Sequence, residues 1–373
     1  MIITRKSKTK TTAYVLCAMT ILCLAGLALV AYSPTDSDKY INEQWYLSTN
    51  NENSEKFANN KNSQKNIKLI SGINHIRKGN QPRKSEDTVV AVIDTQVDWS
   101  HEDLMGKAWK NVKEIPNDHI DNDDNGYIDD SYGYNYLDGK GISSLESSNS
   151  GAHGTAITGL ICANASNGVG IAGLTGKAHV KVMNLVVLDS VTTEGSVSNL
   201  IKAIRYAEKN GAKICNISAN YTETNEELFD VIHQSTMLFV VSAGNRPTLG
   251  LSIDEVANIP AMYNFDNVLT VSALTQECRI LRQANYGMKT VDILAPGDEM
   301  LAPLPENQYA YFSGTSIATP IVASLAALLD QNAENISASD LKKQILALAS
   351  HNDDFKFKIK DGAYLRLTNI LFR

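Results

Sequence analysis

Three residues that could together activate a serine lie in short, distinctive segments of this chain. Asp94 closes the apolar run Thr88–Asp94, His153 opens a His-Gly-Thr sequence, and Ser316 lies within Ser-Gly-Thr-Ser-Ile-Ala-Thr-Pro. A serine hydroxyl is a poor nucleophile until a neighbouring base takes its proton, and a histidine oriented by a carboxylate can act as that base. We therefore predict covalent catalysis with Ser316 as nucleophile, His153 as base and then acid, and Asp94 as the orienting group.

A fourth segment supplies the amide that this chemistry needs. Ser-Ala-Gly-Asn ends at Asn245, whose side-chain N–H can donate to the oxyanion of a tetrahedral intermediate. Taken alone, an Asp after a strand, a surface His or a Ser beside Gly is far more often structural than catalytic. Here all four segments occur together, and Asp before His before Ser is one of the chain orders that build this geometry. We interpret them as one site.

The elements that must position these residues follow from the pattern of apolar runs. Thr88–Asp94 and Val180–Val187 are nearly continuous apolar runs, which are typical of buried parallel strands. Apolar residues at helical spacing predict a helix over Ser198–Asn210. Further strands are predicted at Lys213–Ser218, Leu238–Ser242 and Val268–Ser272, and a helix at Ile317–Leu329 with Pro320 in its first turn.

Strands that alternate with helices predict an α/β fold, with a parallel β-sheet covered by helices on both faces. Functional residues of such sheets gather at the carboxyl ends of the strands. Asp94 ends the first predicted strand, Ser218–Asn220 ends the third, and Ala243–Asn245 follows the fourth. The predicted fold therefore brings these segments to one edge of the sheet.

Taken together, the motif segments resemble those of the subtilisin-like (subtilase) serine endopeptidases. Five other segments match in the same style, and the match covers about residues 41–371: Gln44–Leu47, His101–Leu104, Val169–Gly173, Leu294–Gly297 and Gly362–Leu371. The resemblance implies a subtilisin-like fold in a single catalytic domain over residues 86–373. It also implies polypeptide substrates and no cofactor for catalysis.

The same resemblance implies where a peptide would bind. Substrate would join as an extra strand between two backbone segments, with a third segment as a wall of the pocket for the side chain before the scissile bond. These segments are Gly195, Ser196 and Val197, then Ser218, Ala219 and Asn220, then Ser242, Ala243 and Gly244.

Three residues depart from the family pattern. Gln96 and Asn220 each stand where the family usually has Gly, and Ala156 replaces a second His, a change that other members also carry. Gln96 could tilt Asp94 or crowd the rim of the site, and Asn220 predicts a narrower or more polar pocket. We expect a selective processing or maturation protease, for example of exported leader-containing peptides. The alternatives are a catalytically silent peptide-binding domain and a broad-range secreted degradative protease.

An Asp-rich loop between Asp94 and His153 predicts a structural calcium site. Asp121-Asn122-Asp123-Asp124-Asn125-Gly126 matches the opening of a calcium-binding loop, although Tyr132 stands where a bidentate Glu belongs. The predicted ligands are Asp121, Asp123, Asn125 and Asp130, and Asp103 with Asn164 and Asn167 forms a weaker candidate. The alternative is a solvated acidic turn.

The N-terminus predicts export. Four basic residues between Arg5 and Lys10 precede the uncharged apolar run Ala13–Ala31. Residues 1–33 could be a cleaved signal peptide or a retained signal-anchor, and either would place the rest of the chain outside the cell or at its surface. Residues 34–85 would be the lead-in of the catalytic domain or a short pro-segment.

The net charge limits the classes of partner, and the cysteines limit the kinds of cross-link and metal site. The net charge of −7 argues against nucleic acid, so we expect a monomer that binds polypeptide and touches a membrane only through an uncleaved N-terminus. Outside residues 1–33 the cysteines are Cys162, Cys215 and Cys278. Their number and spacing match neither a disulfide framework nor a metal site, which predicts buried free thiols.

Overall fold

A mostly parallel β-sheet runs through the computed structural model, which describes residues 38–47, 85–146 and 151–365. The parallel strands are β1 (Thr88–Asp94), β2 (Gly133–Asn135), β4 (Val180–Val186), β5 (Ile214–Ile217), β6 (Leu238–Ser242), β7 (Val268–Leu274), β8 (Ile293–Pro296) and β12 (Ala363–Tyr364). Two antiparallel strands lie at the edges, β3 (Lys140–Gly141) and β11 (Ser350–His351). The order across the sheet is β11-β12-β8-β7-β6-β5-β1-β4-β2-β3.

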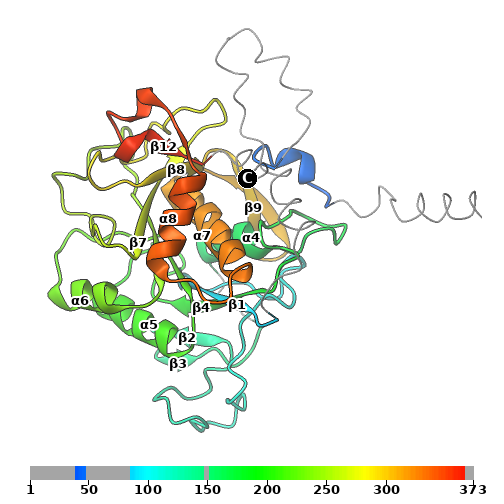
Figure 1. Cartoon of the computed structure of the whole chain (residues 1–373). Helices are drawn as coiled ribbons and strands as arrows, with labels where there is room; N and C mark the ends of the chain where they lie inside the picture. Colours follow the sequence, from blue (N-terminus) through cyan, green and yellow to red (C-terminus); the bar gives the residue numbers. More distant parts are fainter. Residues whose placement is uncertain (1–37, 48–84, 147–150, 366–373) are drawn as a thin grey trace, which may run out of the picture.

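Helices cover both faces of this sheet (Figure 1). One face carries α4 (Ala152–Cys162), α7 (Thr315–Gln331) and α8 (Ala338–Leu348), and the other carries α5 (Val197–Lys209) and α6 (Glu226–Gln234). Short 3₁₀ turns lie at η2 (Ile41–Glu43), η4 (Asp353–Phe355) and η5 (Lys360–Gly362), and β9 (Met300–Leu304) pairs with β10 (Gln308–Phe312) in a separate hairpin. The predicted α/β fold with two covered faces is confirmed.

The strand order reverses at β1, and this reversal creates the crevice for a site. From β1 the chain crosses through α4 to β4 on one side, and then through α5 to β5 on the other side. Because right-handed crossovers in opposite directions place their helices on opposite faces, α4 and α5 separate at this point. Asp94, the last residue of β1, therefore stands at the mouth of the crevice where open α/β sheets bind ligands.

The helix that carries Ser316 differs from the prediction. It begins at Thr315 and not at Ile317, so Ser316 lies in its first turn and Pro320 lies in its interior. The start is set by Gly314, whose φ of 150° suits glycine better than any other residue. Pro320 has no N–H to donate to the carbonyl of Ser316, four residues earlier. The Ser218 hydroxyl donates to that carbonyl at 3.1 Å, which makes the interior proline tolerable.

An N-terminal segment packs into the domain. The Gln44 side chain donates to the Ala172 carbonyl at 3.0 Å and accepts from the Ala172 N–H at 2.8 Å. The Trp45 indole donates to the Asp298 carbonyl at 3.0 Å, and Tyr46 is fully buried. Residues 38–47 are thus built into the fold, whereas the proposed signal segment 1–33 and residues 48–84 lie outside the described residues.

Among the described residues, no helix combines the length and apolarity needed to cross a bilayer. Cys162 and Cys215 are buried free thiols, as predicted, while Cys278 forms no disulfide with a described residue and is only half-buried. Burial raises the pKa of Cys162 to about 12, so this thiol is unreactive at neutral pH.

The contact of α4 with β9 yields a stability prediction. A Cβ on Gly159 would lie 2.1 Å from Cγ of Pro303 in β9. Gly159→Ala should therefore lower the free energy of unfolding by about 1–3 kcal/mol, the usual cost of overpacking. Urea unfolding measures it, with Ala152→Ser, a similar addition at an exposed position of the same helix, as control. Equal stabilities of the two variants would contradict the packing described.

Candidate active site

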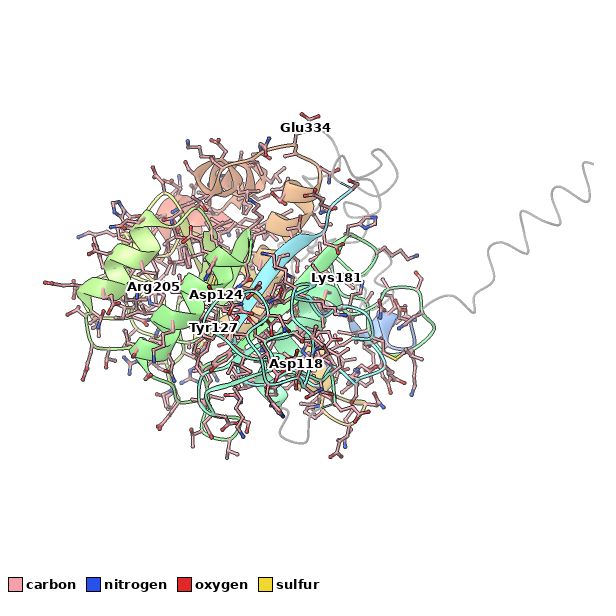
Figure 2. All side chains as sticks on the ribbon, turned by 90° about the horizontal axis from the view of Figure 1, so that it is seen from below. Asp118, Asp124, Tyr127, Lys181, Arg205 and Glu334 are labelled. Atoms are coloured by element: carbon pink, nitrogen blue, oxygen red, sulfur yellow. The ribbon has the colours of Figure 1, made fainter. Side chains whose placement is uncertain are left out.

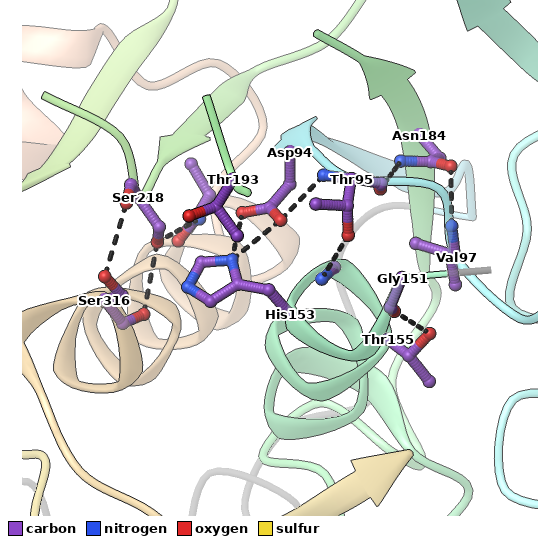
Figure 3. Close-up of polar contacts among 12 residues, drawn as sticks. Asp94, Thr95, Val97, Gly151, His153, Thr155, Asn184, Thr193, Ser218 and Ser316 are labelled. Carbon is purple, nitrogen blue, oxygen red and sulfur yellow. Dashed lines mark hydrogen bonds and ion pairs between the residues drawn. The ribbon is translucent and has the colours of Figure 1, made fainter. Parts of the chain in front are cut away.

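The Asp94 carboxylate and the His153 imidazole form a direct pair (Figure 3). Nδ1 of His153 lies 2.8 Å and 2.9 Å from the two carboxylate oxygens of Asp94. The Thr95 N–H donates to the same carboxylate at 2.7 Å. Asp94 is completely buried, whereas 23% of the His153 side chain is exposed. The pair thus has a closed, anchored carboxylate on one side and an accessible imidazole on the other.

Two glycines allow α4 to approach β1 closely enough for this contact. A Cβ on Gly151 would lie 2.1 Å from Oγ1 of Thr95, and one on Gly154 would lie 2.4 Å from the Thr95 carbonyl oxygen. The Gly154 N–H instead donates to the Thr95 hydroxyl at 2.9 Å, and the Gly151 N–H donates to the Gln96 carbonyl at 2.7 Å. His153, between the glycines, is consequently held against the end of β1.

Residues that the sequence analysis missed hold the loop after Asp94. The amide of Asn184, in β4, donates to the Thr95 carbonyl and accepts from the Val97 N–H, both at 3.1 Å. The Thr155 hydroxyl accepts from the Asp98 N–H at 3.0 Å. A buried Asn in the middle of the apolar run of β4 was the signal that could have identified the first of these contacts.

Gln96 does not disturb the Asp94–His153 pair. Its φ lies outside the left-handed region, so the backbone here does not need the glycine that the family usually has. Its side chain is nearly buried and lines a separate cavity of about 380 Å³ with Asn135 and Asp189. The carboxylate of Asp94 keeps both of its contacts to the imidazole.

The environment of His153 raises the pKa of its imidazole. Burial acts to lower the pKa, but the negative charge of Asp94 and the hydrogen bond to it act to raise the pKa, and together they prevail. The neutral ring, which is the form that can accept a proton, is therefore the main species only above the usual histidine pKa.

Ser316 is tied reciprocally to Ser218. The Ser316 hydroxyl donates to the Ser218 carbonyl at 3.3 Å, and the Ser218 hydroxyl donates to the Ser316 carbonyl at 3.1 Å. Ser316 and His153 line the same cavity, and the imidazole lies between Asp94 and the segment that bears Ser316 (Figure 3). Because Ser316 is in the first turn of α7, the positive end of the helix dipole favours negative charge beside it.

The Asn245 side chain is oriented as a donor. Its Oδ1 accepts from the Thr315 N–H at 3.0 Å, so Nδ2 is the group left to donate in the cavity that Asn245 shares with Ser316. A Cβ on Gly314 would lie only 3.1 Å from that Nδ2. Glycine at this helix start therefore keeps space around the amide.

The predicted peptide-binding segments border a cavity of about 560 Å³. It is lined by Gly195, Ser218, Ala219, Asn220 and Gly244 together with His153, Asn245 and Ser316. The other four predicted residues support its walls. Ser196 caps α5 by accepting from the Asn199 N–H, and Val197 begins that helix. Ser242 donates to Asn220 at 3.0 Å, and Ala243 is buried. Arg246, Asn258 and Asn285 also line the cavity and were not predicted.

The Asp-rich loop groups its carboxylates differently from the prediction. Oxygens of Glu114, Asp121 and Asp123 lie within 4.8 Å of one another. Asn125 instead donates to Asp130 at 2.8 Å. Asp130 also accepts from Asn111 at 3.0 Å and from the Tyr206 hydroxyl at 2.6 Å, and it is not one of the three clustered carboxylates. Figure 2, which views the molecule from below, shows Asp118, Asp124 and Tyr127 of this loop near the middle of the picture.

The weaker metal candidate is a hydrogen-bonded cluster. Asp103 accepts from Asn167 at 3.1 Å, from the Ile171 N–H at 2.8 Å and from the Tyr309 hydroxyl at 2.9 Å. Asn164 donates to the Met105 carbonyl at 3.0 Å. Both Asp103 oxygens therefore have protein partners, and the cluster serves to join the loop at residues 164–171 to β10.

Comparison with known proteins identifies the family. The profile of the Subtilase family, Peptidase S8, matches residues 85–364. The chain belongs to the subtilase family of serine proteases. The "Thermophilic serine proteinase" of Bacillus sp. (strain AK1) is 34% identical over 249 residues, which are 66% of this chain and 53% of that protein. The "Major intracellular serine protease" of Bacillus subtilis (strain 168) is 30% identical over 271 residues, with 70% of this chain and 76% of that protein covered.

A solved structure supports the subtilase fold. The "Structure of Prenylagaramide maturation protease PagA" matches with a TM-score of 0.59 and 23% identity, over 80% of this chain and 97% of that one. At that identity the likeness concerns the fold alone. The chain spans about half the length of the AK1 proteinase, 53%, and of "Subtilisin-like protease 1" of Plasmodium berghei (strain Anka), 49%.

The Asp94–His153 contact yields a titration prediction for this subtilase. By NMR, His153 should titrate above the ordinary value of 6.5 in the wild type. In Asp94→Asn the charge is gone and burial remains, so the midpoint should fall below 6.5. A His153 midpoint that Asp94→Asn leaves unchanged would show that the carboxylate does not control this ring.

Proposed function

We propose that this subtilase is a serine endopeptidase with Asp94, His153 and Ser316 as its triad and Asn245 as an oxyanion donor. The observation that carries the proposal is the Asp94–His153 pair, whose imidazole opens onto the same cavity as Ser316. That cavity is lined by residues from each of the three peptide-binding segments that the family resemblance implied. A buried carboxylate, an accessible base and a serine at a helix start are the parts that acyl transfer needs.

In the proposed first step, the Ser316 hydroxyl turns from the Ser218 carbonyl to Nε2 of His153 and gives up its proton as Oγ attacks the peptide carbonyl. Hydrogen-bonding geometry of this kind is often loose before substrate binds. The imidazolium is held by Asp94, and the oxyanion accepts from Nδ2 of Asn245.

Collapse of the tetrahedral intermediate breaks the C–N bond, and His153 protonates the departing amine. Water then attacks the acyl-enzyme, with His153 again as base and then as acid, so that Ser316 is restored and the acid product leaves. Each proton removed by the imidazole is thus returned in the same half-reaction.

We further propose that the enzyme is exported and selective in its substrates, as a processing protease is. Export rests on the basic residues and the apolar run of residues 1–33. Selectivity rests on the cavity, whose lining includes four asparagines and one arginine and offers Leu188 and Tyr221 as its large apolar side chains. A pocket of this polarity disfavours the large apolar residues that a general degradative protease accepts.

A fluorophosphonate probe tests the catalytic proposal. The wild type should become labelled on Ser316, and Ser316→Ala should not. Asn245→Ala should keep its fold and KM while kcat falls about 10²–10³-fold, because the amide acts on the oxyanion and not on the ground state. Lack of labelling in the folded wild type would support a silent peptide-binding domain instead.

A separate assay tests selectivity. Hydrolysis of unfolded casein at many large apolar residues would contradict selectivity.

We also propose a structural calcium ion in the Asp-rich loop, held by Glu114, Asp121 and Asp123. Oδ1 of Asp123 is buried without a hydrogen-bond partner, and Glu114 is 4% exposed. Burial raises the pKa of Glu114, and the nearby acidic groups add to the effect. A hard divalent cation prefers carboxylate oxygens and would relieve both the repulsion and the orphaned oxygen.

Chelation tests the calcium proposal. EGTA should lower the Tm of the wild type, and added Ca²⁺ should restore it, because an ion that binds only the folded state stabilises it by mass action. Asp123→Asn should abolish this response. The matched control is Asp124→Asn, which alters an exposed neighbouring carboxylate and should leave the response intact. A wild-type Tm that is the same in EGTA and in Ca²⁺ would refute the site.

A further inference from the structure

The wall of the active-site cavity behind Ser242–Gly244 is built from asparagine amides. Asn258 and Asn285 both donate to the Ala243 carbonyl, at 2.7 Å and 3.0 Å. The amide of Asn220 donates to the Ser242 carbonyl at 2.8 Å. All three side chains converge on Gly244, where a Cβ would meet them at 2.9–3.3 Å. Anchored amides are costly to cover with a hydrocarbon side chain, so this wall suits a polar one.

Arg246 lies beside this wall and immediately after the oxyanion donor. It lines the cavity and is exposed. Its N–H donates to the Gln283 carbonyl at 2.9 Å, and Asn245 pairs with Ala284, so the backbone that carries the guanidinium is pinned. Among the ion pairs of the described residues, none involves Arg246. Its charge is therefore available to a ligand in the cavity.

The position of Arg246 identifies the substrate residue that it faces. The oxyanion forms on the carbonyl of the residue before the scissile bond, and Asn245 would bind it. Arg246 follows Asn245 directly in the chain, with about 3.8 Å between their Cα atoms, and both line the same cavity, so the long guanidinium side chain can reach the side chain of that substrate residue.

The cavity lining also includes one acidic residue, Glu194. Glu194 follows β4 and Arg246 follows β6, and β1 and β5 lie between these two strands. No ion pair within the described part of the chain joins Glu194 to Arg246, so Glu194 does not neutralise the guanidinium by direct pairing.

We propose that Arg246 selects an acidic side chain, Glu or Asp, at the residue immediately before the scissile bond. The inference rests on the proposed protease function and adds its substrate class. The guanidinium pairs with the carboxylate, and the amides of Asn258 and Asn285 surround the site in place of an apolar floor. An arginine fork suits a carboxylate because two parallel N–H groups match its two oxygens.

Four peptide anilides test this proposal on the full chain: acetyl-Ala-Ala-Ala-Xaa p-nitroanilides with Xaa as Glu, Gln, Leu or Lys. In the wild type, kcat/KM for Glu should exceed that for Gln about 10–100-fold, as expected for charge-assisted hydrogen bonds. Arg246→Gln should bring that ratio to within about threefold. Arg246→Glu should invert the preference to Lys.

Two controls accompany the variants. Arg205→Gln removes an exposed arginine that pairs with Glu227 at 2.8 Å and does not line the cavity, so the Glu/Gln ratio should stay at its wild-type value. Fluorophosphonate labelling reports whether each variant keeps a folded, reactive Ser316. A wild type that prefers Leu, or a ratio that Arg246→Gln leaves unchanged in labelled enzyme, would overturn the proposal.

Binding separates this inference from the catalytic proposal. Calorimetry of the same anilides with Ser316→Ala measures affinity without turnover, and the Glu peptide should bind about 10–100-fold more tightly than the Gln peptide. Equal or absent binding overturns the role of Arg246, whatever the probe shows. Failure of the wild type to label, with the Glu preference retained in binding, overturns the catalytic proposal alone.

Discussion

The interaction on which the site depends is the burial of the Asp94 carboxylate. A carboxylate with no exposed surface is stable only where donors surround it, and here they come from the Thr95 N–H and the His153 ring. The ring can reach it only if α4 lies against the end of β1. The glycines at 151 and 154 permit that approach, because any side chain there would overlap Thr95. The close packing of α4 on β1 and the pairing of the buried Asp94 carboxylate thus both require glycines at positions 151 and 154.

A second constraint couples the proposed nucleophile to the proposed peptide-binding segment around Ser218. Pro320 leaves the Ser316 carbonyl without its helical partner, and the Ser218 hydroxyl supplies the donor. The Ser316 hydroxyl in turn donates to the Ser218 carbonyl. The carbonyl that Pro320 leaves unpaired inside α7 therefore accepts the hydrogen bond that aligns this helix with the end of β5. The distance from the serine to the edge along which a peptide would lie is consequently set by one reciprocal pair.

The carboxylates of the Asp-rich loop show what the local sequence predicts and what the packing of distant elements determines. The motif around Asp121 identified an acidic loop, but Glu114, which lies outside that motif, completes the carboxylate cluster, while Asp130 is occupied by Asn111, Asn125 and Tyr206. The motif predicts where oxygens occur along the chain. It does not predict which of them other side chains will engage, because those donors come from distant elements.

The sequence by itself determined the fold class, the strand that ends at Asp94 and the four motif segments, because hydrophobic periodicity and short-range turn chemistry are local properties of the chain. The tertiary structure decided what surrounds them. The hydrogen bonds of Asn184, the backbone conformation of Gln96 outside the left-handed region, and the convergence of Asn220, Asn258 and Asn285 on Gly244 depend on contacts between elements far apart in sequence. Such contacts arise only when the sheet order is set; a local pattern can mark one participant, as the Asn within the apolar run of β4 does, but it does not name the partners.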